Sequence, residues 1–356
     1  MNDAVAARLQ KKASLAFLPT PLQAVPRLGA ALGTEDLWVK RDDLTDVAGG
    51  GNKLRKLEYF VQEARDQGAS VLITFGKLQS NHIRCTAAAA ARAGMKCIAF
   101  YQDDEPTRRT GNTALAGLLG AELRFLGEVD ALATNGAIRD LVREQERAGV
   151  RCFVIPEGGG DAIGALGFVA AAFELRAQLG DSGHAPAAVV IGAGSGGSMA
   201  GLALGLRLSL PATRLIAISV GPAAAALARR AAQIATGAAR LLQLEQRFTP
   251  ADFEVRDEWV GEQGYGSATA AGDQAALTAA RQEGLLLDPT YVAKAFAGLT
   301  ALVQRKDLAS DGRLVFWHTG GGPGLFAREG WLDGISRRRR DPIQFPSPAT
   351  VEEQPE

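Results

Sequence analysis

The chain has 356 residues, of which 47% are hydrophobic and 22% charged, and its 39 lysines and arginines balance its 39 aspartates and glutamates. This is the composition of a folded globular protein, and a formal net charge of zero gives no reason to expect a nucleic-acid partner. Three cysteines without paired spacing, and no apolar run of about 20 residues, predict a cytoplasmic protein with no metal site and no membrane partner.

Short apolar runs alternate along the chain with longer alanine-rich stretches of helical periodicity. The short runs predict strands over Val71–Phe75, Lys96–Tyr101, Leu123–Leu126, Cys152–Ile155, Ala187–Gly192, Leu215–Val220 and Arg313–Trp317. Helices are predicted between them, over Asn81–Ala93, Ile163–Leu179, Ser198–Leu208 and Thr290–Gln304. This alternation is typical of an α/β fold with mostly parallel sheets and helices on both faces. The Pro-, Ser- and Glu-rich segment 341–356 is expected to be a flexible tail.

Lys53 follows the glycine run Gly49–Gly51 and opens a stretch of helical character. Glycines let a backbone approach a ligand closely, and the first turn of a helix offers free N–H groups and the positive end of a dipole. A lysine at such a place can contact a phosphate as a point charge, or it can form a Schiff base with a carbonyl group. The alternative is a solvated lysine, so the interpretation depends on the other motifs.

Four polar or glycine-rich loops follow predicted strands. They span Gly76–His82, Pro156–Asp161, Ala193–Ser198 and His318–Gly324. Ligands of parallel sheets bind at the carboxyl ends of the strands, in the loops that lead into the following helices. The four loops therefore predict one shared site.

The segment Gly192–Gly197 matches the dinucleotide-binding pattern G-x-G-x-x-G. The next predicted strand, Leu215–Val220, is not followed by the carboxylate that a nicotinamide site needs, so the dinucleotide interpretation fails. A phosphate monoester suits the loop better, because the loop combines backbone N–H groups, two hydroxyls and a helix N-terminus. The residues expected to contact the phosphate are Gly194, Ser195, Gly196, Gly197 and Ser198.

Further candidate groups are hydroxyls and amides. Ser80 is a suitable N-cap for the helix predicted from Asn81, and it is also a hydroxyl that could hold a substrate carboxylate. No G-x-S-x-G elbow is present, so an acyl-transfer hydrolase is not indicated. Tyr265 and Tyr291 are either core tyrosines with satisfied hydroxyls or groups for proton transfer. Thr319 ends the last predicted strand and could face a ring nitrogen of a bound cofactor.

Several motifs, in the same order along the chain, resemble the D-cysteine desulfhydrase / 1-aminocyclopropane-1-carboxylate deaminase family. The resemblance extends from about Phe17 to Phe326. The motifs that carry it are Thr20-Pro21-Leu22, Val39-Lys40-Arg41-Asp42-Asp43-Leu44, Gly50-Gly51-Asn52-Lys53-Leu54-Arg55-Lys56-Leu57-Glu58, Gln79-Ser80-Asn81-His82, Pro156-Glu157-Gly158-Gly159, Asp288-Pro289-Thr290-Tyr291 and His318-Thr319-Gly320-Gly321.

The resemblance implies a fold-type-II pyridoxal phosphate enzyme with two three-layer α/β/α domains and the cofactor between them. Residues 1–49 and 161–340 would form the large domain and residues 50–160 the small one, and the family suggests a homodimer. Lys53 would form the Schiff base, and Lys56 would contact the phosphate together with the loop from Gly194 to Ser198. Asn81 would lie near the phenolic oxygen of the cofactor and Thr319 near its pyridine nitrogen. Ser80, Asn81 and His82 would hold the substrate.

The reaction implied is α,β-elimination from a small sulfur-containing amino acid, which releases pyruvate, ammonia and sulfide. Lys53 would take the α-proton, and Ser80 with Tyr265 or Tyr291 would assist proton transfer in roles that could be exchanged. The alternatives are an L-cysteate sulfo-lyase, a 1-aminocyclopropane-1-carboxylate deaminase and a β-replacement transferase on the same scaffold. Product analysis would be needed to choose among them.

Four positions depart from the family pattern. Val292 stands where the deaminase branch has a glutamate, which disfavours opening of a cyclopropane ring. The pair Gly160-Asp161 replaces a Ser-Asn pair of the desulfhydrases. Lys77 precedes the Gln-Ser-Asn loop, where a small residue is usual. Its side chain is expected either to point to solvent or to place a cation near an anionic group of the substrate, as in cysteate.

Overall fold

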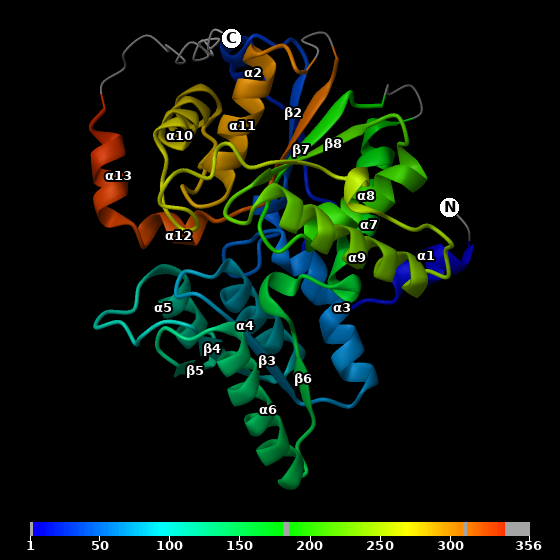
Figure 1. The fold of residues 1–356 in the computed structure, drawn as a ribbon, viewed down its shortest axis with the longest axis vertical. Coiled ribbons are helices and arrows are strands. Elements are labelled where there is room, and N and C mark those ends of the chain that lie inside the picture. The colour runs from blue at the N-terminus through cyan, green and yellow to red at the C-terminus, as the bar shows by residue number, and fades with distance from the viewer. Residues whose placement is uncertain (1–2, 181–184, 309–311, 339–356) are drawn as a thin grey trace, which may run out of the picture.

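The computed structural model describes residues 3–180, 185–308 and 312–338, and in these residues ten strands form two separate sheets (Figure 1). The segment 341–356, expected to be a tail, lies outside the described residues. The larger sheet has the strand order β1-β2-β10-β7-β8-β9 and the smaller sheet has the order β5-β4-β3-β6.

The larger sheet is parallel except for its edge strand β1, which pairs antiparallel with β2. Its strands are β1 (Leu22–Ala24), β2 (Leu37–Arg41), β7 (Ala188–Ala193), β8 (Arg214–Ser219), β9 (Glu254–Arg256) and β10 (Leu314–His318). Consecutive residues of β10 enter different cores, since Val315 and Trp317 pack on one face while Leu314 and Phe316 pack on the other. This period-2 alternation, with both faces apolar, is what a buried parallel sheet requires.

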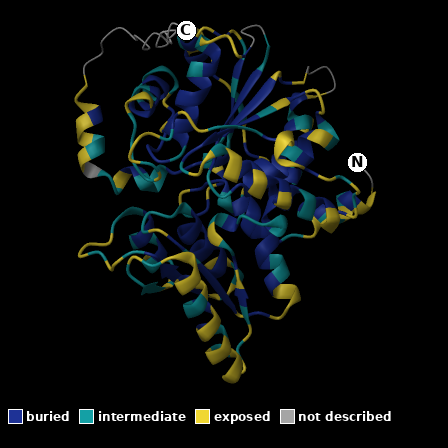
Figure 2. Cartoon of the chain, in the orientation of Figure 1, coloured by how far each residue is buried: buried dark blue, intermediate teal, exposed yellow. Residues whose placement is uncertain are grey.

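Helices cover both faces of the larger sheet. One face is covered by α7 (Ala162–Leu179), α8 (Gly197–Ser209) and α9 (Ala224–Leu241), with α1 (Asp3–Gln10) packed on α7. The other face is covered by α2 (Pro26–Leu32), α10 (Ala270–Glu283), α11 (Val292–Gln304) and, at its margin, α13 (Glu329–Ser336). Figure 2 shows the two resulting cores as continuous buried regions around the strands.

The smaller sheet is parallel throughout and consists of β3 (Val71–Gly76), β4 (Lys96–Tyr101), β5 (Glu122–Phe125) and β6 (Cys152–Val154). The helices α3 (Lys53–Asp66), α4 (Asn81–Ala93) and α5 (Gly111–Leu118) share its main core, and α6 (Ala131–Arg147) covers the other face. The short α12 (Gly322–Phe326) contacts α5, and single 3-10 turns occupy Asp42–Leu44, Glu157–Gly159 and Pro250–Asp252.

The expected α/β fold with helices on both faces of mostly parallel sheets is confirmed. The predicted helix Asn81–Ala93 and strand Lys96–Tyr101 have the observed bounds, and the other predicted elements are shifted by one or two residues at their ends. The described strands of the smaller sheet all lie within 50–160 and those of the larger sheet outside it. The boundary residues of the two domains stay a prediction.

The expectation that no segment resembles a membrane span is not met by the segment that contains helix α7. Within the described residues, Glu157–Leu179 is long and apolar enough to cross a membrane by length and composition. Its burial explains this composition, because α7 packs against α3, α8 and α9 and its residues Leu166, Phe168 and Leu175 are fully buried. A helix that is apolar on all sides is typical of a protein core.

Candidate active site

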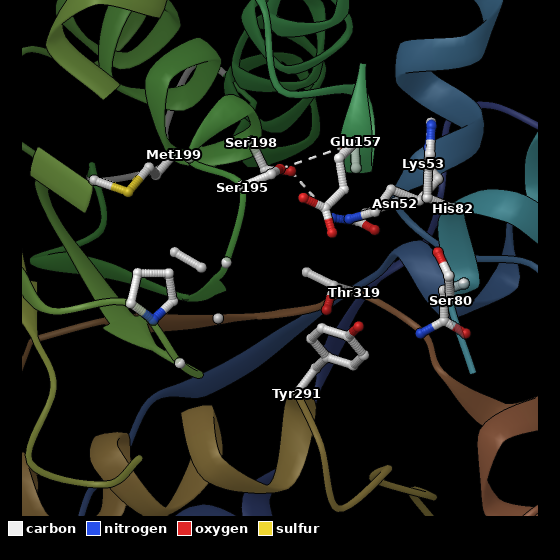
Figure 3. A pocket seen from close by; sticks show the side chains of 18 of the residues that line it. Asn52, Lys53, Ser80, His82, Glu157, Ser195, Ser198, Met199, Tyr291 and Thr319 are labelled. Atoms are coloured by element: carbon white, nitrogen blue, oxygen red, sulfur yellow. Dashed lines mark hydrogen bonds between the residues drawn. The ribbon is translucent and has the colours of Figure 1, made fainter. Parts of the chain in front are cut away.

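A cavity of about 270 Å³ lies between the two sheets, and all four of the loops expected to share a site contribute to it. The smaller domain supplies Lys53 from the start of α3 and Ser80–His82 from the start of α4, while the larger domain supplies Gly192–Gly196 and Thr319. Figure 3 shows Ser195 and Ser198 on one side of this cavity and Tyr291 on the opposite side.

Lys53 is the first residue of α3, and the glycine run before it sets its position. Gly50 has a φ of 65°, and a side chain built there would meet the backbone oxygen of Asp43 at 2.1 Å, so only glycine fits. The backbone N–H of Asn52 donates to the carbonyl oxygen of Thr319 over 2.9 Å, which ties the start of α3 to the end of β10. Burial lowers the pKa of Lys53 to about 8, so its amine can act as a nucleophile or a base near neutral pH.

The start of α8 forms an anion cradle. Its N-cap is Gly196, with a φ of 83°, and the first-turn N–H groups of this 13-residue helix have no intrahelical acceptor. Lys56 reaches the same place from α3: its Nζ donates to the carbonyl oxygen of Gly158 over 3.0 Å and lies 3.0 Å from the point where a Cβ on Gly197 would sit. A side chain at position 197 would therefore fill the cradle.

Two serine hydroxyls complete the cradle. The Ser198 hydroxyl accepts a hydrogen bond of 3.0 Å from Nδ2 of Asn52, and the Ser195 hydroxyl donates to the carbonyl oxygen of Gly158 over 3.4 Å. Burial and the positive charges of Lys53 and Arg230 lower the pKa of Lys56, so a bound dianion would restore its protonated form. Backbone N–H groups, hydroxyls and a lysine suit a phosphate monoester, and the neighbouring Lys53 suits an aldehyde. The residues present therefore fit pyridoxal 5'-phosphate.

Ser80 and Asn81 each have a free hydrogen-bonding group that can point into the cavity. The Ser80 hydroxyl accepts from the backbone N–H of Ile83 over 3.2 Å, so it is the N-cap of α4 and still has its own proton to donate. The Asn81 side-chain oxygen accepts from Asn112 over 3.0 Å, which leaves the Asn81 amide protons for a ligand. Both side chains are placed to hold a carboxylate or a cofactor oxygen.

His82 lies in the wall of the cavity with its ring buried. The Thr74 hydroxyl donates to the carbonyl oxygen of Ile155, so it must accept from Nε2–H of His82, which lies 2.9 Å away. The other ring nitrogen, Nδ1, is then an acceptor, and it has no partner among the described residues. Burial and the charges of Lys53 and Lys56 hold the pKa of His82 well below its usual value, so the ring stays neutral. Substrate contact by His82 is thus limited to a single acceptor atom.

Tyr265 and Tyr291 both line the cavity, and their hydroxyls form a hydrogen bond with each other. Their rings meet edge to face, with centroids 5.9 Å apart. Asp288 fixes the position of Tyr291, because its buried carboxylate accepts 3.0 Å hydrogen bonds from the backbone N–H groups of Thr290, Tyr291 and Val292. Neither tyrosine hydroxyl is therefore an ordinary core group.

The structure places Thr319 at the cavity and Lys77 away from it. Thr319 lines the cavity, and its hydroxyl makes no hydrogen bond within the part of the chain that the structure describes. Lys77 is exposed, does not line the cavity, and contacts the carbonyl oxygen of Gln102 and the carboxylate of Asp103, the latter at 3.4 Å. Of the two alternatives for Lys77, the structure does not fit a cation near the substrate. The loop after β4 holds the Lys77 ammonium away from the cavity.

Several cavity residues were not predicted as site residues, among them Asn52, Glu157 and Arg230. Asn52 directly precedes Lys53, and its place in the Gly-Asn-Lys motif was a usable signal. Arg230 lies within α9, about 35 residues beyond the phosphate loop, and has no local motif around it. Among the described residues, no group of three or more His, Cys, Asp and Glu side chains is arranged to hold a metal ion.

Comparison with known proteins agrees with this geometry. The model of the family "Pyridoxal-phosphate dependent enzyme" matches residues 13–320. A D-cysteine desulfhydrase of Klebsiella pneumoniae subsp. pneumoniae is 40% identical over 315 residues, which cover 87% of this chain and 93% of the relative. A D-cysteine desulfhydrase of Serratia proteamaculans is 40% identical over 314 residues, covering 86% and 93% of the two chains.

Solved structures give the same result. The crystal structure of an ACC deaminase homologue superposes with a TM-score of 0.84 at 34% identity, covering 94% of this chain and all of the other. A threonine deaminase of Solanum lycopersicum, 18% identical with a TM-score of 0.66 and covering 94% and 87% of the two chains, shares the fold. The family resemblance and the cofactor inferred from the motifs are confirmed. The chain belongs to the family of pyridoxal-phosphate dependent enzymes, in which it is a lyase that uses pyridoxal 5'-phosphate.

Proposed function

We propose that this enzyme catalyses α,β-elimination from D-cysteine or a closely similar amino acid, so that D-cysteine and one water give pyruvate, ammonia and hydrogen sulfide. The observation that carries the proposal is one cavity in which Lys53 lies with Ser80 and with the hydroxyl pair of Tyr265 and Tyr291. These side chains supply a base, a carboxylate site and an acid. The desulfhydrases that are 40% identical to the chain support D-cysteine as the first substrate to test.

Lys53 moves the α-proton of the substrate, and Ser80 with Asn81 holds its carboxylate. When bound at Lys53, the cofactor supplies an electron sink for the charge that develops on this carbon. The amine of Lys53, with a pKa of about 8, accepts the α-proton near neutral pH. The hydroxyl proton of Ser80 and the amide protons of Asn81 hold the substrate carboxylate, which fixes the α-carbon relative to Lys53.

The tyrosine pair supplies the acid for the leaving group. Burial raises the pKa of Tyr291 above its usual value, so it remains a phenol at neutral pH. Its hydrogen bond with Tyr265 lets either hydroxyl deliver a proton while the other holds it in place. The departing sulfur then leaves as hydrogen sulfide rather than as the hydrosulfide anion.

The alternatives are less well supported by the cavity. Val292 is buried in the core between α11 and the larger sheet and does not line the cavity, so no carboxylate takes the place that the deaminase branch gives to a glutamate. The position of Lys77 away from the cavity removes the reason for preferring cysteate. A β-replacement reaction would use the same side chains and differs only in what reacts after the sulfur has left.

The test is keto-acid release by the cofactor-loaded protein from D-cysteine, L-cysteine, both cysteate enantiomers, D-serine and 1-aminocyclopropane-1-carboxylate. Pyruvate and sulfide in equal amounts from D-cysteine, and no product from a Lys53→Ala variant, are expected. Release of 2-oxobutyrate from the cyclopropane would contradict the assignment. Loss of pyruvate with formation of a new thioether when another thiol is added would instead indicate replacement.

We further propose a cytoplasmic homodimer. The family resemblance supports the dimer, and cysteines without paired spacing support a reducing compartment. Light scattering after gel filtration should give twice the 37.3 kDa chain mass. A monomer at micromolar concentration would contradict this.

A further inference from the structure

Helix α9 lies directly behind the anion cradle. A Cβ built on Gly196 would lie 3.5 Å from the side chain of Leu227 and 3.7 Å from the backbone nitrogen of Ala231, both on α9. The residue before Ala231 is Arg230, and it lines the same cavity as Ser195 and Lys53. This helix therefore brings a positive charge to the edge of the cradle.

The guanidinium of Arg230 lies against the loops that form the cradle. A Cβ built on Gly160 would meet Nη2 of Arg230 at 3.3 Å and the backbone oxygen of Ser195 at 2.9 Å, so these three groups share one small region. Arg230 is close enough to Lys56 for its charge to lower the pKa of that lysine. Within the described residues, Arg230 makes no hydrogen bond and no ion pair.

Asp161 partly offsets the charge of Lys56, but Arg230 adds a second positive charge beside a helix N-terminus, and these groups together attract an anion. The anion must lie near Ser195 and Gly160, at the phosphate side of the cavity, rather than near Tyr291 on the opposite side (Figure 3). Arginine suits a phosphate because its planar N–H groups can bind two oxygens at once.

We propose that Arg230 binds the phosphate of pyridoxal 5'-phosphate and closes the cradle from the α9 side. The proposal rests on the cofactor and not on the identity of the substrate. Arg230 thus holds the cofactor without taking part in proton transfer, and its contribution should appear in cofactor affinity and not in the affinity for the dephosphorylated aldehyde.

The test measures binding to the apoprotein by the absorbance of the lysine-bound cofactor, for pyridoxal 5'-phosphate and for pyridoxal, which lacks the phosphate. Arg230→Gln should weaken pyridoxal 5'-phosphate binding roughly fivefold, because the arginine is partly solvent-exposed and its ion pair is screened. Pyridoxal binding should be unchanged, and Arg230→Lys should retain most of the affinity for the phosphorylated form.

The adjacent Arg229 gives a matched control. It is also an exposed arginine of α9, but it lines a separate surface hollow with Phe248 and Pro250. Arg229→Gln should therefore leave the binding of both compounds unchanged. If it weakens cofactor binding as much as Arg230→Gln does, the effect belongs to the general charge of α9 and the proposal is wrong.

Two further outcomes would overturn the proposal. Equal weakening of pyridoxal and pyridoxal 5'-phosphate in Arg230→Gln would show that the substitution distorts the cavity. Unchanged cofactor binding, with a higher KM for cysteate but not for D-cysteine, would show that Arg230 contacts the substrate instead. Neither result would affect the assignment of the elimination reaction, which the keto-acid assay tests separately.

Discussion

At the residue scale, the depressed pKa of Lys53 predicts how cofactor capture depends on pH. Burial lowers this pKa from 10.5 to about 8, so the reactive neutral amine becomes abundant as the pH rises through 8. We expect the rate at which the apoprotein captures pyridoxal 5'-phosphate to increase with a midpoint near pH 8. Stopped-flow absorbance measures this rate, and Lys53→Ala, which cannot form the Schiff base, is the blank. A midpoint above pH 10 would mean that Lys53 is solvated.

Asp288 predicts an acidic limit to activity. Burial raises its pKa to about 6, and its ionised form accepts three backbone hydrogen bonds that hold Tyr291. Protonation below pH 6 weakens these bonds, so kcat/KM should fall as the pH decreases through about 6. Asp288→Asn is neutral at all pH values, and we expect it to have a kcat/KM about tenfold lower at pH 8, with the step near pH 6 removed. An unchanged step in this variant would assign it to another group.

At the element scale, a buried ion network fixes α3 against the larger domain. Arg55 of α3 donates two 2.8 Å hydrogen bonds to Asp42 and two more, of 2.9 and 3.0 Å, to Glu174 of α7, and Lys40 of β2 also contacts Glu174. Trp317 of β10 donates to Asp42 over 2.8 Å. The helix that carries Lys53 and Lys56 is thus held by carboxylates from the turn after β2 and from α7.

Removing one member of this network should be costly. Asp42 is fully buried, so Asp42→Asn leaves Arg55 with only one carboxylate partner and should lower the free energy of unfolding by about 3 kcal/mol. The control is Asp140→Asn, which breaks a solvent-exposed pair with Arg143 at 3.9 Å and should change stability by less than about 0.5 kcal/mol. Urea unfolding measures both. Equal effects would show that burial of the network contributes little.

Close packing of α7 on α3 gives a second prediction for the elements. A Cβ on Gly167 of α7 would lie 2.3 Å from the backbone oxygen of Arg55 and 3.0 Å from the nitrogen of Lys56, so Gly167→Ala must push α3 away. We expect a loss of about 1–3 kcal/mol in stability and weaker cofactor binding, because Lys56 moves with α3. Gly334→Ala in α13, where a Cβ meets nothing within 4 Å, should affect neither property.

At the scale of the whole molecule, the cavity joins the two domains. Lys53 and Ser80 come from helices of the smaller core, whereas Ser195 and Thr319 follow strands of the larger sheet. A ligand that contacts both sides binds only when both domains are folded. At about 100 times its Kd, pyridoxal 5'-phosphate should therefore stabilise the native state by about 2.7 kcal/mol.

Calorimetry can test whether this stabilisation acts on both domains. The whole unfolding transition should move to higher temperature on addition of the cofactor, with no part of the melt left at its apoprotein position. Two transitions, of which only one moves, would show that the cofactor contacts a single domain.

The sequence by itself determined seven of the ten described strands and the loops that line the cavity. Hydrophobic periodicity and helix capping depend only on residues close together in the chain. The helix Asn81–Ala93 was therefore predictable, because the N-cap Ser80 precedes it and the C-cap Gly94 follows it. The strand β2 was missed because Lys40 and Arg41 look polar, although Lys40 is fully buried by its contact with Glu174, a residue more than 130 positions away. The loops at strand ends were identifiable because parallel sheets place their ligands there.

Only the tertiary structure decided which charged groups enter the cavity. Lys77 lies three residues before Ser80, yet Asp103 of another loop holds its ammonium away from the cavity. Arg230 has no motif around it, yet the packing of α9 behind Gly196 brings it to the cradle. The physical reason is that local sequence sets backbone conformation, whereas the direction and the partners of a long charged side chain depend on elements distant in the chain.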